Sequence, residues 1–178
     1  LQQLCHSKGQ WAGKAFDLLP WQEQVVRDIF GIVDRTDGTR QFRNVVVEIP
    51  KKQGTSELAA AIALYLLCAD QEPGAEIYGC AKDRKQAEII FNVAKDMVMM
   101  NPALRRLCKY NETQKRLIFL PTRSVYQAVS GEVENKQGLN GHGCIFDGLL
   151  TQPNRRLFDV MTKGSGAARS QPLNFIIT

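Results

Sequence analysis

The spacing of apolar residues along the chain predicts alternating strands and helices. A helix is expected from Pro20 to Val33, because apolar positions recur there at helical spacing and a proline stands in the first turn. Asn44 to Ile49 is a β-branched run typical of a strand. A short polar loop follows, and then a strong helix former from Glu57 to Cys68. The local order is therefore strand, tight loop, helix.

The same order repeats in the middle of the chain. Ala75 to Ala81 predicts a strand and Arg84 to Met100 a helix, which completes a βαβ unit. A short helix is expected from Ala103 to Lys109. The β-like runs Arg116 to Leu120 and Ser124 to Val129 predict a hairpin, since only a short turn separates them.

The last third of the chain continues the alternation. A polar, glycine-containing loop is expected from Ser130 to Gly143, followed by a short apolar strand from Cys144 to Asp147. The pattern then predicts a helix from Pro153 to about Thr162 and a strand over Phe175 to Ile177. Such alternation indicates an α/β fold with a mainly parallel sheet flanked by helices.

Composition narrows the class of protein. The 178 residues fit one domain, and the chain lacks an apolar run long enough to cross a bilayer, so we expect no membrane partner. The five widely spaced cysteines, mostly in apolar runs, suit buried free thiols in a reducing compartment.

The chain begins without Met and ends in a strand-like run, so we expect it to be part of a longer product. A net charge of +5 favours an acidic partner, most commonly nucleic acid, although the excess is modest.

The first candidate site is the loop between the β-branched strand and the next helix. A glycine-containing turn at a helix start can present backbone N–H groups to phosphate. The P-loop pattern requires lysine directly before Ser or Thr, and this chain has Thr55 there, so an ordinary βα turn remains an alternative. The residues of this candidate phosphate loop are Lys51, Lys52, Gln53, Gly54, Thr55 and Ser56.

The second candidate is Asp147, which ends an apolar strand as the magnesium-holding carboxylate of P-loop NTPases does. Taken alone, such an aspartate more often caps a helix or forms a turn. If the two strands lie side by side in one parallel sheet, Ser56 could bind Mg²⁺ directly and Asp147 could orient its waters.

The third candidate is Gln22, in the first turn of the first predicted helix. Its paired donor and acceptor could recognise an adenine edge. The alternative is an exposed glutamine on a surface helix. The stripe from Met97 to Met100 is better explained by core packing than by a ligand surface.

Taken together, the motifs resemble one family. The chain is similar, from about residue 16 to its end, to the ATPase domain of the terminase large subunit of tailed phages and prophages. Residues 1–15 are then a lead-in, residues 16–178 the P-loop ATPase domain, and the nuclease domain is expected to be absent. The ordered series is more specific than any single motif: Leu19–Gln22, Ile49–Ala60, Gly138–Gly143, Ile145–Leu149 and Gln152–Arg155.

The resemblance implies a RecA-like P-loop NTPase that assembles as a ring around DNA and uses ATP and Mg²⁺. It places Gln22 beside adenine, the candidate phosphate loop on the phosphates, and Ser56 and Asp147 at the metal. Ile176 to Thr178 resembles the start of the segment that couples hydrolysis to motion. The implied partners are double-stranded DNA, the capsid portal and the small terminase subunit. The implied location is the cytoplasm of an infected host cell, with transient attachment to the procapsid.

Two positions depart from the family pattern. Thr55 stands where the family has lysine, and Gly148 where it has the glutamate that follows the metal aspartate. Threonine cannot place a positive charge between phosphates, and glycine cannot activate water; loss of a general base typically costs about 10²–10⁴-fold in rate. Lys51 or Lys52 could replace the missing lysine, since related packaging motors can carry it earlier in the loop. Hydrolysis by this chain is therefore in doubt.

Two functions from different classes remain open at this point. One is a DNA-packaging motor ATPase, and the other is a catalytically degenerate nucleotide- or DNA-binding module that acts structurally in an assembly. A helicase-type ATPase would carry further motifs that this sequence lacks. Arg155 or Arg156 could be an arginine finger, a DNA-phosphate contact like the pair Arg105 and Arg106, or part of a solvated face. DNA binding should be weak, independent of sequence and salt-sensitive, and the isolated chain largely monomeric.

Overall fold

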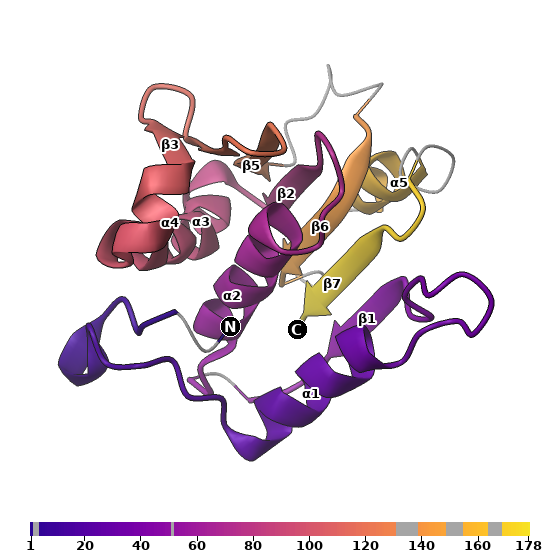
Figure 1. Ribbon diagram of the computed structural model, residues 1–178, viewed down its shortest axis with the longest axis horizontal. Helices are drawn as coiled ribbons and strands as arrows, with labels where there is room; N and C mark the ends of the chain where they lie inside the picture. The colour runs from indigo at the N-terminus through magenta and orange to yellow at the C-terminus, as the bar shows by residue number, and fades with distance from the viewer. Residues whose placement is uncertain (2–3, 51, 131–138, 149–154, 164–168) are drawn as a thin grey trace.

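The computed structural model describes residues 1, 4–50, 52–130, 139–148, 155–163 and 169–178. Its helices and strands alternate along the chain as the apolar pattern predicts (Figure 1). In chain order they are the 3-10 helix η1 (Gly9–Trp11), α1 (Pro20–Gly31), β1 (Asn44–Val47), α2 (Thr55–Cys68), β2 (Glu76–Ala81), α3 (Arg84–Met100), α4 (Pro102–Leu107), β3 (Cys108–Asn111), β4 (Arg116–Phe119), β5 (Ser124–Ser130), β6 (Gly141–Asp147), α5 (Arg156–Lys163) and β7 (Leu173–Ile177).

The described strands form one seven-stranded sheet in the order β1-β7-β6-β2-β5-β4-β3. The strands from β1 to β5 in this order are parallel, and β4 and β3 extend the sheet with antiparallel pairs. The hairpin of β4 and β5 is confirmed, with Arg116 opposite Gln127. The parallel strands therefore end together at one edge, called here the carboxyl edge of the sheet.

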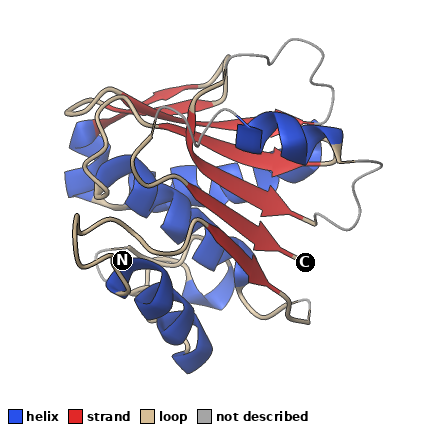
Figure 2. Ribbon diagram, turned by 90° about the vertical axis from the view of Figure 1, so that its right-hand side faces the viewer, coloured by secondary structure: helices blue, strands red, loops and turns tan. Residues whose placement is uncertain are grey.

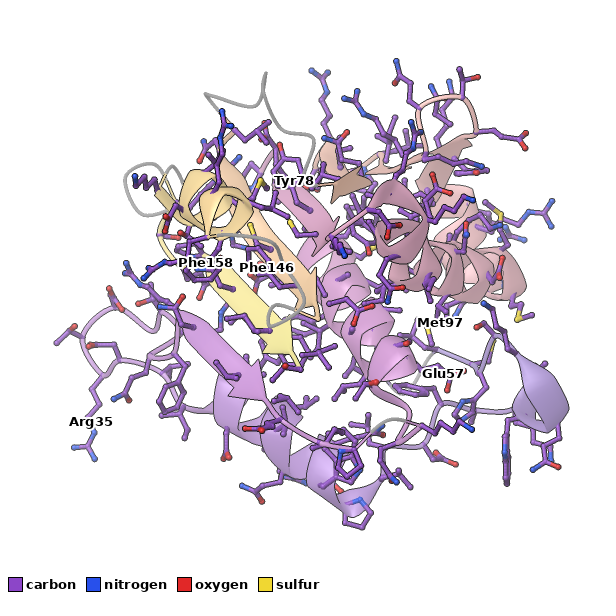
Figure 3. The ribbon with its side chains drawn as sticks, turned by 180° about the vertical axis from the view of Figure 1, so that it is seen from behind. Arg35, Glu57, Tyr78, Met97, Phe146 and Phe158 are labelled. Atoms are coloured by element: carbon purple, nitrogen blue, oxygen red, sulfur yellow. The ribbon has the colours of Figure 1, made fainter. Side chains whose placement is uncertain are left out.

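Helices cover both faces of the sheet (Figure 2). On one face, α2 and α3 pack with alternate strand residues such as Ile145 into the larger core. On the other face, α5 packs over Cys144 and Phe146, with the rings of Phe146 and Phe158 5.2 Å apart (Figure 3). Helices on both faces explain why β6 and β7 are buried at nearly every position rather than at alternate positions.

Helix α2 is apolar on nearly every side because it lies between the sheet and α3. It approaches β6 so closely that a Cβ built on Gly143 would come within 2.6 Å of Leu66 Cδ1. This close contact accounts for one correction to the sequence prediction. Gly141 to Gly143, expected to be the end of a loop, form the first half of β6.

A second correction concerns the chain after α4. The short helix expected up to Lys109 ends at Leu107, and Cys108–Asn111 form the edge strand β3. Pairing of Cys108 with Phe119 and of Tyr110 with Leu117 in β4 prevails over a weak local helical preference.

The predictions for sulfur-containing residues hold in part. All five cysteines are free, and Cys80, Cys108 and Cys144 are buried. Met97 is fully buried as expected, whereas Met100, at the end of α3, is 44% exposed. Among the described residues, no helix is both long enough and apolar enough to traverse a bilayer.

A buried polar network joins three segments at the opposite, amino ends of the strands. Arg40, before β1, makes a paired contact with Asp70, after α2, at 2.7 and 3.0 Å. His142 Nε2 in β6 lies 2.5 Å from Asp70 Oδ2. Burial by itself would raise the pKa of Asp70, but hydrogen bonds from His142 and Arg40 outweigh burial and hold that pKa below its usual value.

Replacing Asp70 with alanine should destabilise the fold by about 3–5 kcal/mol at neutral pH, because it leaves the buried Arg40 guanidinium without its counter-charge. Urea unfolding measures this loss. Since the folded-state pKa of Asp70 is depressed, its stabilisation is present above the unfolded-state value of about 3.9 and is lost as pH falls through the folded value.

The matched control is Asp28→Ala, since Asp28 is exposed and accepts only a surface hydrogen bond from Gln24 at 2.9 Å. It should change stability by less than about 0.5 kcal/mol. Equal losses in the two variants would show that the buried network does not hold the amino ends of the strands together.

Candidate nucleotide-binding site

The candidate phosphate loop begins after β1 and opens α2, as predicted. Gly54 is the N-cap residue in a left-handed conformation (φ +77°), and Lys52 also has positive φ (+69°). Thr55 and Ser56 then occupy the first turn of the 14-residue helix and are half-buried. Lys52 and Gln53 are exposed, and Lys51 lies outside the described residues. The turn thus presents the positive end of a helix dipole at the carboxyl edge of the sheet.

Gln22 contacts this loop directly. Its Oε1 accepts the Leu19 N–H at 3.0 Å, and its Nε2 donates to the Gly54 carbonyl at 3.5 Å. The side chain is only 2% exposed, so the alternative of an exposed surface glutamine is wrong. Gln22 is buried by a tertiary contact, because the first turn of α1 packs over the loop.

Asp147 ends β6 at the same edge and is half-buried. Its Oδ2 accepts a hydrogen bond of 2.6 Å from Gln86 Nε2, in the first turn of α3. The next residue, Gly148, has a left-handed backbone (φ +67°), and its N–H donates to the Ile177 carbonyl at 2.9 Å. The position of the family glutamate is therefore a glycine in a conformation that glycine favours.

The strands that carry these two elements are not neighbours, contrary to the arrangement considered from sequence. β7 lies between β1 and β6 and pairs in parallel with both. Adjacent strands are about 4.8 Å apart, so β1 and β6 are separated by about 10 Å. Ser56 and Asp147 share the carboxyl edge, but their strands are bridged by a third one. The position of β7 between β1 and β6 could not be predicted from local sequence, because strand pairing depends on residues far apart in the chain.

Beside the loop is a pocket of about 330 Å³, formed by α1, the start of α2 and the N-terminal segment. His6 Nδ1 lies 2.5 Å from Glu57 Oε2, which joins that segment to α2; Figure 3 labels Glu57. The lining residues are His6, Trp11, Phe16, Leu19, Gln22, Lys52, Gln53, Gly54 and Glu57.

Sequence reasoning missed the part played by the N-terminal segment. Leu4 and Phe16 are buried in the larger core, and an antiparallel bridge joins Cys5 to Ala15. The segment has two aromatic residues but no periodic pattern of apolar positions, so its sequence did not predict this packing. Gln86 was also missed, although its place just after the end of β2 was a usable signal, because parallel strands end at one edge.

The two arginine pairs singled out from sequence lie on opposite faces of the sheet. Arg105 and Arg106 are in the last turn of α4, whose Leu104 packs against the larger core, whereas α5 packs on the other face. Arg155 Nε lies 3.5 Å from Asp159 in an exposed pair. The two pairs therefore do not form one continuous basic surface.

Comparisons with known proteins agree with this architecture. The fold is that of the RecA-like class, a mostly parallel sheet between helices. Residues 20–178 match the family model for the terminase large subunit, ATPase domain. The chain therefore belongs to the family of terminase large subunit ATPase domains.

Individual relatives show the same similarity. The chain is 30% identical over 174 residues to the terminase large subunit of Enterobacteria phage HK97, covering 96% of this chain and 33% of that protein. The crystal structure of the HK97 large terminase superposes with a TM-score of 0.82 at 29% identity, covering 99% of this chain and 36% of that one. A variant of the Thermus phage P74-26 large terminase ATPase domain has a TM-score of 0.69 at 19% identity over 92% of this chain and 65% of that one, which supports the fold alone. The chain thus spans about a third of the length of its HK97 relative.

Substitution of Gly54 with alanine should cost more than an ordinary glycine change. A Cβ there would meet Gln22 Nε2 at 3.1 Å, in addition to the left-handed backbone. The left-handed conformation costs about 1 kcal/mol for a residue other than glycine, and displacing the buried Gln22 should add about 1 kcal/mol. Urea unfolding measures the sum.

Gly38→Ala is the control, because Gly38 has a similar φ of +72° with nothing near the added Cβ. It reports the backbone cost alone. The packing of Gln22 onto the loop would be refuted by equal destabilisation in the two variants.

Proposed function

We propose that this chain is the ATPase motor domain of a viral DNA-packaging terminase large subunit, which binds Mg-ATP to drive DNA into a procapsid. The observation that supports it most directly is the tie through β7. Thr178, directly after β7, donates to the Val47 carbonyl at 3.1 Å, and Gly148 donates to Ile177 at 2.9 Å. The candidate phosphate loop and Asp147 are thereby tied to opposite sides of one strand.

Each candidate residue has a role that its position suits. The N–H groups from Gly54 to Ser56, at the start of a long helix, would bind phosphate oxygens. Ser56 would hold Mg²⁺ through its hydroxyl, and Asp147 would orient the metal's waters. Mg-ATP supplies, when bound, the phosphoanhydride bond whose hydrolysis powers the motor.

The residues present fit such a ligand. Gly54 is exposed, and a side chain at this position would contact Gln22. The Asp147 carboxylate lies at the same edge of the sheet. The neighbouring pocket combines aromatic side chains with the amide of Gln22, as a purine base requires. Because Gln22 hydrogen-bonds Leu19 and Gly54, it would link the base pocket to the phosphate loop.

The two departures from the family support slow turnover. Thr55 lacks the charge of the usual lysine, which Lys51 or Lys52 would have to supply. Gly148 cannot act as a base, and its left-handed φ of +67° would strain a glutamate. These residues favour the second candidate function, a catalytically degenerate module that binds nucleotide or DNA and acts structurally in an assembly.

The partners follow from the proposed motor role. Double-stranded DNA, the capsid portal and the small terminase subunit would act on a ring of such chains in the cytoplasm of an infected host cell, transiently on the procapsid. Arg155 or Arg156, at the start of α5 and exposed, would be the candidate arginine finger or DNA-phosphate contact. Since the two arginine pairs lie on opposite faces, DNA lying on one face would reach only one of them.

Ser56→Ala should weaken ATP binding in the presence of Mg²⁺ by roughly tenfold, because the substitution removes a direct metal ligand, while binding in EDTA should change little. Isothermal titration calorimetry in Mg²⁺ and in EDTA gives the two dissociation constants for ATP. Ser170→Ala, an exposed serine before β7 at the opposite end of the sheet, is the control. A dissociation constant weaker than several millimolar, with no dependence on Ser56, would remove the nucleotide site.

Restoring the family residues should raise DNA-stimulated phosphate release. The double variant Thr55→Lys, Gly148→Glu should gain about 10²–10⁴-fold from the general base alone. Its thermal unfolding temperature should fall, because the left-handed backbone at Gly148 costs about 1–3 kcal/mol for another residue.

The matched control is Thr55→Met, Gly148→Gln, which has similar volumes and the same backbone strain but no added charge. It should remain inactive. If the charged pair also stays inactive when the rest of the large subunit and its ring partners are supplied, the motor function fails and the structural module remains.

A further inference from the structure

The contact between Gln86 and Asp147 joins two elements that are 61 positions apart in sequence. Gln86 Nε2 donates to Asp147 Oδ2 at 2.6 Å. We propose that Gln86 is a positioning residue that holds the Asp147 carboxylate in place for the metal. This inference rests on the proposed function of Asp147 in binding Mg-ATP.

Local structure fixes where Gln86 stands. Asp83 is the N-cap of α3, and its Oδ1 accepts the Gln86 N–H at 2.9 Å, so the backbone of Gln86 is held in the first turn. Asp-x-x-Gln at a helix start normally forms a capping box, in which the glutamine side chain folds back to the N-cap N–H. Here the amide extends to β6 instead. The Gln86 side chain thus contacts Asp147 at the sheet edge instead of capping its own helix.

The order of the strands in the sheet brings Gln86 and Asp147 together. β2 pairs directly with β6, with Cys80 opposite Phe146 one residue before Asp147. The turn that follows β2 therefore delivers the start of α3 to the end of β6. Gln86 is half-buried, which restricts its rotamers and favours a defined geometry.

The chemistry of a glutamine suits this task better than a charged side chain would. A neutral N–H donor fixes one carboxylate oxygen without cancelling the negative charge that attracts a divalent cation. A lysine or arginine in its place would compete with the metal electrostatically. Side chains that orient a ligand carboxylate in this way typically change metal affinity by 10–100-fold when removed.

The test measures how much Mg²⁺ strengthens ATP binding by the 178-residue chain. Calorimetric titrations with ATP in Mg²⁺ and in EDTA give this gain as a ratio. Gln86→Met should reduce the gain roughly tenfold and leave binding in EDTA unchanged. Gln86→Asn, which keeps the amide but is one carbon shorter, should behave like Gln86→Met.

A double-mutant cycle separates positioning from general structural damage. Asp147→Asn should abolish most of the gain, and adding Gln86→Met to it should have no further effect, because Gln86 acts through Asp147. The control is Gln24→Met, which removes another glutamine–aspartate hydrogen bond, to Asp28 on the exposed side of α1. It should keep the full gain.

The outcomes distinguish the two proposals. If the unmodified chain binds ATP with a Mg²⁺-dependent gain and Gln86→Met retains it, positioning by Gln86 is refuted while the proposed function stands. An equal loss in Mg²⁺ and EDTA also refutes positioning, since it indicates structural damage. Absence of any Mg²⁺-dependent gain in the unmodified chain overturns the proposed function, and the positioning role with it.

Discussion

Hydrogen bonding of β7 to both β1 and β6 is the interaction on which the arrangement of the candidate site depends. Asn174 opposes Asn44 on one side and Cys144 on the other, so one strand sets the register of both neighbours. The phosphate loop and Asp147 have no direct strand pairing with each other. Any shift of β7 would therefore move Asp147 relative to the loop.

The two ends of the sheet have different physical characters. At the amino ends of the strands, the buried Asp70 carboxylate contacts both the Arg40 guanidinium and the His142 ring. At the carboxyl edge, Gly54 and Gly148 adopt left-handed backbone conformations at the ends of regular elements. The buried polar contacts at the amino ends thus lie away from the edge that carries the candidate site residues.

Local patterns predicted the elements well because helix and strand periodicity is a short-range property. The bounds of α3, the strand–loop–helix order at Gly54, and the hairpin of β4 and β5 all followed from spacing and turn residues. The strand order did not follow, since insertion of β7 depends on pairing with a segment 130 positions away. Tertiary packing also explains why Gly141–Gly143 form a strand, since they pair with β2 and Gly143 has no side chain to obstruct Leu66 of α2.

The same distinction applies to the site. The positions of the candidate phosphate loop and of Asp147 in the fold could be predicted because each follows or ends a strand that the sequence itself marks. Gln22 was recognised as a candidate, but its burial required knowledge of how α1 packs. The partners His6 with Glu57 and Gln86 with Asp147 are 51 and 61 positions apart, and no sequence periodicity relates them. Contacts of this kind become visible only when the sheet is assembled.

The position of β7 between β1 and β6 also constrains the order in which the chain can fold. β1 is synthesised long before its strand partner, which is formed by Leu173–Ile177. Until that segment emerges, β1 has a pairing edge with no strand to occupy it, and the phosphate loop has no sheet to hold it. Such non-local closure is slow, because loop entropy is lost before the contact is gained. Any nucleotide binding that needs the ordered geometry of the candidate phosphate loop would therefore have to wait until Leu173–Ile177 has been synthesised.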